Sequence, residues 1–307
     1  MKLDIELLKR LLIIDHPSKQ EYPMLSFIIN ECYKIGGLEF EMDCYNNIFI
    51  TKNTSNPDYY VAVIAHTDCV LPHPNKSVVI RNGVITGKDS KNGKQIGLGC
   101  DDAVGVCLAL QLLKVMPNLK VCFTTEEEIG FLGATEAAEN LEFWFNVSYM
   151  IQADRHGTTD LITHTNGIFS ASDEWLEFAK PIAAKYGYKE EYGLGTDVGE
   201  LAGLLCLSGV NLSCGYFKEH SDREYANVIG IQNCLNLMAE IILSVPVDRQ
   251  YTIDVKSSYY NWYKYYTGKY DMRDYAADDY PTEDNWELPC DHCQHNYDCM
   301  NCTEKFY

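Results

Sequence analysis

The residues that could do chemistry in this chain gather at the ends of predicted strands. The first segment is AHTDCV, in which His66 and Asp68 follow an apolar run at 59–65. Side chains two residues apart on an extended chain lean the same way. His66 could therefore bind a metal through one ring nitrogen while Asp68 accepts a hydrogen bond from the other. A polar turn after a strand is the alternative interpretation.

Two acidic segments could extend such a site. Asp101 and Asp102 lie in GLGCDDAVGV, between a glycine-rich loop and a predicted helix. They could cap the helix, or Asp101 could bridge two cations. Glu127 and Glu128 belong to the run EEEIG, which follows another apolar strand. Hydrolysis can use one carboxylate as a metal ligand and its neighbour as general base, whereas a solvated helix start would need neither.

Asp154 in QADRHG and His220 in YFKEHSDREY also follow predicted strands. This is the edge of an open α/β sheet at which ligands bind. Two histidines, several carboxylates and no cysteine suit two zinc ions with open positions for water and substrate. The candidate set in chain order is His66, Asp101, Glu127, Glu128, Asp154 and His220.

The elements that must position this set alternate between strands and helices. Continuous apolar runs predict strands buried on both faces at 59–65, 119–125, 147–153 and 208–214. Apolar residues at helical spacing predict helices at 3–13, 23–35, 102–115, 131–140, 171–187 and 225–243. A strand, turn and strand are expected over 38–52, and a hairpin around Asn82-Gly83 over 78–87. The prediction is an α/β fold, a three-layer α/β/α arrangement with a mixed, largely parallel central sheet.

The HxD, G-x-DD-x-x-G and EE-(I/V/L)-G blocks, in this order, resemble the co-catalytic zinc exopeptidases. This superfamily includes peptidase T-like, carboxypeptidase G-like and acylase-like enzymes and single-domain zinc aminopeptidases. The resemblance covers residues 1–247 and implies a catalytic domain with two Zn²⁺, or Co²⁺ or Mn²⁺ in their place. It implies that His66, oriented by Asp68, and Asp154 bind one zinc. Asp101 would bridge both ions and join Asp102 through a cis peptide bond.

The resemblance also implies that Glu128 and His220 hold the second zinc and that Glu127 is the general base. Glu127 would take a proton from a water activated by both ions and deliver it to the leaving amine. Such a reaction hydrolyses a peptide or amide bond.

The spacing between the last two ligand blocks separates the members of this superfamily. Two-domain members insert a lid or dimerisation domain there, but Asp154 and His220 are only 66 positions apart. The lid is therefore expected to be absent, and with it the usual carboxylate-binding arginine, which favours an aminopeptidase acting on short peptides. An N-acyl amino acid deacylase or carboxypeptidase of the same fold is one alternative, and a non-catalytic metal-binding interaction protein is another.

Two further residues are candidates for substrate contact. Asp197, in GTD, matches a family position near the cleft and could meet a substrate ammonium or cap a helix. Arg155 follows Asp154 and could touch substrate or belong to a surface loop.

Residues 248–307 form a separate predicted region, an acidic tail that holds 11 of the 22 tyrosines. Within 290–302 the pattern C-x2-C-x5-C-x2-C pairs two CxxC motifs, as in structural zinc sites with four cysteine ligands. The gap between the motifs is short for such a site, so a redox dithiol pair or free cysteines are alternatives. The four cysteines are Cys290, Cys293, Cys299 and Cys302.

Composition excludes several classes of protein. A net charge of −19 argues against a nucleic-acid partner, and no apolar run is long enough to span a bilayer. The start MKLDIELLKR lacks the apolar stretch of a signal peptide. A cytoplasmic protein is therefore expected, whose 13 cysteines are reduced thiols or metal ligands.

Overall fold

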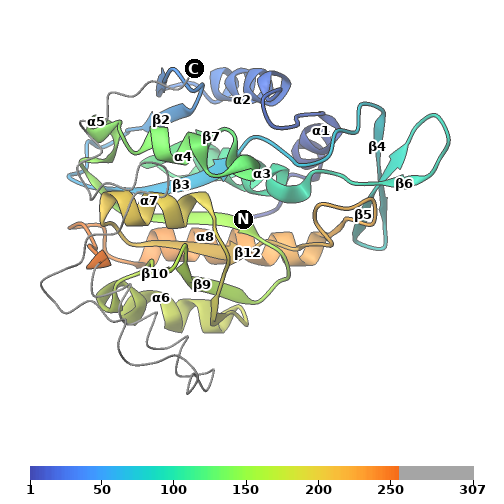
Figure 1. Ribbon diagram of the computed structural model, residues 1–307. Coiled ribbons are helices and arrows are strands. Elements are labelled where there is room, and N and C mark those ends of the chain that lie inside the picture. The colour runs from blue at the N-terminus through green and yellow to red at the C-terminus, as the bar shows by residue number, and fades with distance from the viewer. Residues whose placement is uncertain (256–307) are drawn as a thin grey trace, which may run out of the picture. The chain divides into compact units, whose positions relative to one another are not determined.

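The computed structural model describes residues 1–255, and everything beyond them, the tail cysteines Cys290, Cys293, Cys299 and Cys302 included, lies outside the described residues. Within residues 1–255 the strands form one large mixed sheet and one small antiparallel sheet (Figure 1). The predicted α/β fold is confirmed.

The large sheet has nine strands in the order β1-β2-β7-β3-β8-β12-β9-β10, with β11 beside β9. Its centre is parallel, because β3 pairs in parallel with β7 and β8, and β12 does so with β8. The pairs β1–β2, β2–β7, β12–β9 and β9–β10 are antiparallel. The strands are β1 (Leu38–Met42), β2 (Ile48–Lys52), β3 (Tyr60–His66), β7 (Leu119–Thr124), β8 (Val147–Arg155), β9 (Asp160–Thr165), β10 (Ile168–Phe169), β11 (Lys189–Tyr192) and β12 (Gly209–Ser213).

Helices cover both faces of this sheet. Val61, Val63 and Ala65 of β3 pack into a core shared with α1, α2, α3, α6 and α8, whereas Ala62 and Ile64 face a core shared with α4, α5 and α7. Successive strand residues point to opposite faces, so burial on both sides explains the unbroken apolar run. The helices are α1 (Ile5–Ile13), α2 (Tyr22–Ile35), α3 (Cys100–Val115), α4 (Leu132–Ala137), α5 (Leu141–Trp144), α6 (Asp173–Lys185), α7 (Asp197–Leu205) and α8 (Val228–Ser244).

The small sheet begins with the predicted hairpin. Asn82 and Gly83 have φ values of 51° and 79°, as a two-residue hairpin turn requires, and they join β4 to β5. β4 covers one edge of β5, so β14 and β6 pair one after the other along its opposite edge. The strands are β4 (Lys76–Arg81), β5 (Val84–Asp89), β6 (Gln95–Ile96), β13 (Tyr216–Phe217) and β14 (Tyr225–Asn227).

Asparagine caps change the bounds of two predicted helices. The helix expected over 131–140 ends at Ala137, and α5 begins after Asn140, whose side chain accepts a hydrogen bond from Phe143 N. The helix expected over 225–243 begins after Asn227, whose side chain caps α8, and the residues before it form β14. In both places an asparagine oxygen satisfies an amide that has no partner within the helix.

The described chain continues along the sheet after Val247. Tyr251 and Ile253 are buried, and Thr252 forms a β-bridge with Leu207. Among the described residues, no helix has both the length and the apolar character of a transmembrane segment.

Candidate metal centre

Three neighbouring strands of the large sheet bring the first candidate residues together. His66 ends β3, Glu127 and Glu128 follow β7 in a single helical turn, and Asp154 lies near the end of β8. Because these strands are parallel neighbours, their carboxyl ends meet at one edge of the sheet.

The small sheet supplies the remaining two. Asp101 lies in the first turn of α3, which follows β6 through the loop 97–99, and His220 lies in the loop between β13 and β14. Since β6 and β14 share one edge of β5, both loops are anchored to the same strand. The six candidates thus converge from two sheets.

Asp101 lies at the centre of the cluster. Its Oδ1 is 2.9 Å from Nε2 of His66, and its Oδ2 is 3.2 Å from Nε2 of His220. His66 Nε2 is 3.5 Å from Asp154 Oδ1, and His220 Nε2 is 3.0 Å from Glu128 Oε1. The arrangement therefore consists of two sets of donors, one around each histidine, that share one carboxylate.

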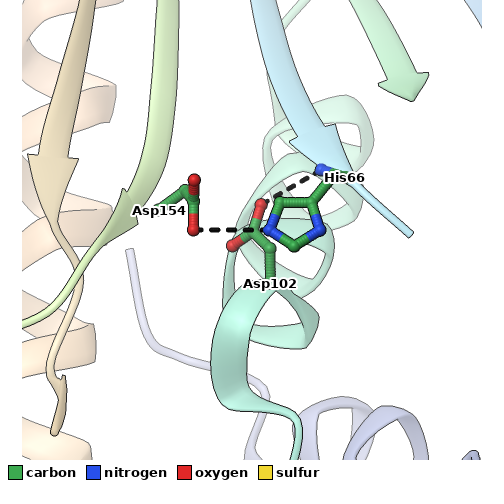
Figure 2. Close-up of side chains that lie close together, drawn as sticks. All are labelled: His66, Asp102 and Asp154. Carbon is green, nitrogen blue, oxygen red and sulfur yellow. Dashed lines mark hydrogen bonds and ion pairs between the residues drawn. The ribbon is translucent and has the colours of Figure 1, made fainter. Parts of the chain in front are cut away.

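Asp102 is also close enough to His66 and Asp154 to be considered as a metal ligand in place of Asp101. Its carboxylate, His66 and Asp154 have donor atoms within 4.8 Å of one another, and Figure 2 shows them together at the end of β3. However, Asp102 Oδ2 accepts the backbone N–H of His66 at 3.2 Å, and Oδ1 accepts that of Gly105 at 2.9 Å. Asp102 thus ties the start of α3 to β3. Its peptide bond with Asp101 is cis, as the resemblance implied.

Asp68 supports the cluster from behind. Its Oδ1 lies 3.3 Å from His66 Nδ1, on the far side of the ring from Asp101. Its two oxygens also accept the backbone N–H groups of Glu127 and Glu128, at 3.0 and 3.2 Å. The backbone carbonyl of Asp68 also lies 3.1 Å from His66 Nδ1. Asp68 therefore orients the ring through its carbonyl and its carboxylate, and the carboxylate also holds the acidic turn.

Asp154 is held by neutral donors. Gln152 Nε2 and Thr196 Oγ1 donate to its Oδ2 at 3.1 and 3.3 Å, and the Tyr216 hydroxyl donates to its Oδ1 at 3.1 Å. These bonds position the carboxylate without neutralising its charge.

The cluster brings together buried carboxyl groups whose charged forms repel one another. Burial raises the pKa of Glu127 to about 10, an effect that the charge of His66 offsets only in part. Burial and the charge of Asp101 hold the pKa of Asp154 well above its ordinary value. Within residues 1–255, no lysine or arginine pairs with either carboxylate. Bound cations would relieve this repulsion, and the histidine and carboxylate donors suit zinc.

A cleft of about 340 Å³ opens over the cluster. Phe131, Leu194 and Gly195 form an apolar part of its lining, and Glu127 and Asp101 reach it from the cluster. The cleft is thus large enough to admit part of a peptide.

Of the two residues expected to contact substrate, Arg155 lines the cleft and Asp197 does not. Arg155 lines the cleft, although its Nε also pairs with Asp160 Oδ2 at 3.3 Å. Asp197 is completely buried, does not line the cleft, and accepts a hydrogen bond from the Thr124 hydroxyl. The Asp197 carboxylate thus lies outside the lining of this cleft, and its contact with a substrate ammonium stays a prediction.

Sequence reasoning missed several residues that this geometry brings to the site. Tyr216 bonds Asp154, Ser18 donates to Asp68 Oδ2 at 2.7 Å, and Glu219 pairs with His156 at the cleft. Ser18 lies far from the motifs along the chain, so no local pattern marks it. Tyr216 and Glu219 follow the strand that precedes His220, and proximity to that ligand is the only signal they carry.

Comparisons with known proteins bear on the family and the fold. Residues 47–198 match the model of Peptidase family M28. No curated protein matches the chain.

Similar solved structures include three peptidases. Aminopeptidase PepT from Bacillus cereus is 16% identical, with a TM-score of 0.66, over 78% of this chain and 96% of that chain. A tripeptidase from Staphylococcus aureus is 15% identical, with a TM-score of 0.63, over 78% and 96%. An aminopeptidase from the archaeon Desulfurococcus kamchatkensis is 16% identical, with a TM-score of 0.61, over 79% and 95%. At this level of identity the similarity establishes a common fold.

Proposed function

Because this chain belongs to peptidase family M28 and is a metal-dependent peptide hydrolase, we propose that it is a dizinc aminopeptidase acting on short peptides. The observation that carries the proposal is the position of Asp101, whose two oxygens lie 2.9 and 3.2 Å from the Nε2 atoms of His66 and His220. A carboxylate so placed can bridge two cations, each with a histidine of its own.

The proposal assigns each donor to one ion. His66, Asp101 and Asp154 would hold the first zinc, and Asp101, Glu128 and His220 the second. Support comes from the separation of these donors into two sets and from the repulsion among buried carboxylates described above. Co²⁺ or Mn²⁺ would suit the same ligands.

The bound ions would supply Lewis acidity and a water whose pKa lies near neutrality. Glu127 and Glu128 both line the cleft. One donor atom from each of them and one from His66 lie within 4.8 Å of one another. The Glu127 carboxylate would accept the proton of the attacking water and deliver it to the nitrogen of the leaving amine. Asp68 would hold this turn and the His66 ring in their positions relative to each other.

Two observations favour an aminopeptidase over a carboxypeptidase. The one arginine that lines the described cleft, Arg155, already pairs with Asp160 Oδ2 at 3.3 Å and so is not free for a substrate carboxylate. The chain between Asp154 and His220 forms elements of the catalytic body itself, from β9 to β12, and contains no separate lid.

The test uses the full-length protein loaded with zinc and a panel of aminoacyl nitroanilides, unblocked di- and tripeptides and N-acyl amino acids. Cleavage of the first two classes is expected. Cleavage of N-blocked substrates alone would instead support the deacylase or carboxypeptidase alternative.

A matched pair of variants tests the role of the acidic turn. Glu127→Gln should lower kcat by about 10²- to 10⁴-fold, the usual worth of a general base, while zinc content stays at two per chain. Glu126→Gln changes the adjacent residue, which does not line the cleft, and should leave kcat unchanged. Equal activity in both variants would refute the assignment of the base.

A further inference from the structure

The carboxylate of Glu224 binds three consecutive backbone amides on a distant loop. Its Oε2 accepts the N–H groups of Leu98 and Gly99 at 2.5 and 2.8 Å, and its Oε1 accepts that of Cys100 at 2.9 Å. The side chain is buried, with 3% of the residue exposed. Hydrogen bonds to an ionised carboxylate are about twice as strong as neutral ones. We call these three bonds the Glu224 tether.

The tether joins the loop that precedes Asp101 to the loop that contains His220. Asp101 directly follows the three bound amides, and His220 lies four residues before Glu224. Between these anchors, Asp101 Oδ2 and His220 Nε2 are 3.2 Å apart. The two loops are remote in sequence, so this contact fixes their separation where the small sheet ends.

The bound loop has little freedom of its own. A Cβ atom on Gly97 would lie 3.0 Å from the His73 ring and 3.1 Å from the Ser221 carbonyl oxygen. Lys76, also buried, donates to the Leu98 carbonyl at 2.9 Å. The loop is therefore packed against the His220 loop rather than merely close to it.

Gly99 also restricts the conformation of this loop. Its φ of +68° is in the left-handed region, and a Cβ there would lie 3.2 Å from Nε2 of the buried His16 ring. Glycine is needed at this position, and the conformation aims the Leu98, Gly99 and Cys100 amides at one carboxylate.

We propose that Glu224 is a positioning residue that sets the spacing between Asp101 and His220 and thereby the affinity of the metal that these two ligands share. The inference rests on the ligand assignment of the proposed function. Glu224 does not line the 340 Å³ cleft. It borders a separate cavity of about 20 Å³ beside Asp101, Glu128 and His220, which has room for about one water molecule and not for a substrate. Glu224 therefore acts through the two loops. The ligands His66 and Asp154 lie on the large sheet, outside the tether.

This role predicts an asymmetric loss of metal. In Glu224→Gln one carboxylate oxygen becomes an amide nitrogen, which cannot accept from the loop. Cobalt would be titrated into the metal-free full-length protein and followed by visible absorption. One of the two cobalt affinities should fall about 10- to 100-fold, as is typical when an outer hydrogen-bond partner of a metal ligand is lost. The other affinity should fall less.

Glu31→Gln is the matched control. Glu31 is also a buried carboxylate, with 4% exposed, but it pairs with Arg10 and Lys34 on α1 and α2. This variant should lose stability without changing either cobalt affinity. If Glu224→Gln does not fold by circular dichroism, Glu224→Asp replaces it, because the shorter side chain keeps the charge but cannot reach all three amides. The same asymmetric loss is then expected.

Failure of this inference is distinct from failure of the proposed function. Wild-type protein that binds fewer than two cobalt ions would overturn the dizinc proposal. Wild-type protein that binds two, with a folded Glu224 variant that binds both at wild-type affinity, would overturn the tether alone. Equal weakening of both equivalents, or the same loss in Glu31→Gln, would also overturn it.

Discussion

Asp68 Oδ1 accepts the backbone N–H of Glu127 at 3.0 Å while it lies 3.3 Å from Nδ1 of His66. One oxygen atom thus links the end of β3 to the acidic turn after β7. The proposed zinc ligand and the proposed general base therefore share a single support, and a change at Asp68 reaches both.

Asp68→Asn should lower both zinc affinity and kcat by about 10- to 100-fold, because an amide nitrogen would face an N–H donor where an oxygen now accepts. Zinc retained after dialysis against a chelator, together with kcat, measures the effect. Ser18→Ala removes only the hydroxyl that donates to Asp68 at 2.7 Å, and its effect should be a small fraction of this loss. Equal effects in the two variants would contradict a special role for the carboxylate.

Phe131 provides a prediction about substrate choice. Its ring lines the cleft beside Leu194 and packs so closely on Gly195 that a Cβ there would lie 2.4 Å from a ring carbon. Phe131→Ala should raise KM about tenfold for leucyl and phenylalanyl substrates and less for alanyl ones, since apolar contact is worth about 1–3 kcal/mol per group. Ile129→Ala, an exposed neighbour outside the cleft lining, is the control and should change neither KM.

Two helical glycines should respond in opposite ways to alanine. A Cβ on Gly133 would lie 2.1 Å from the Thr125 carbonyl oxygen, so Gly133→Ala should destabilise the protein by about 1–3 kcal/mol, the usual cost of overpacking. On Gly203 the nearest atom would be Ile168 Cδ1 at 3.5 Å, and Gly203→Ala should stabilise by about 0.5–1 kcal/mol. Urea unfolding of both variants measures the difference, and a neutral Gly133→Ala would show that β7 and α4 can separate.

His164 predicts a dependence of stability on pH. The ring is 5% exposed between Phe169 and Tyr192, and burial lowers its pKa from 6.5 to about 4. The unfolded chain therefore binds a proton between pH 6.5 and 4 that the folded chain does not. The contribution of His164 is fully present above pH 6.5 and is lost as the pH falls toward 4, by up to about 1.4 kcal/mol per pH unit.

His164→Gln removes this titration. The free energy of unfolding, measured in urea at pH 7 and pH 5, should fall less for the variant than for wild type. Parallel losses in the two proteins would show that the His164 ring is already charged in the folded state at pH 5.

Local sequence patterns were enough to predict several elements of the fold. The unbroken apolar runs predict β3, β7 and β8 because both faces of these strands are buried, and the polar residues directly after them were recognisable as candidates. Asn82 and Gly83 marked their hairpin, because both adopt positive φ. The strands β9 and β10 were missed, since polar residues in DLITHT obscure the pattern of β9 and β10 has only two residues.

Which distant groups meet could not be predicted from local patterns. Asp197 was a candidate by motif, yet the fold buries it completely and outside the lining of the cleft. Glu224 carried no signal of its own, and its contact with Leu98 arises because β6 and β14 share one edge of β5. Local patterns reflect how each segment meets solvent and its own backbone, whereas contacts between segments over 120 residues apart depend on strand order, which is settled by packing of the whole domain.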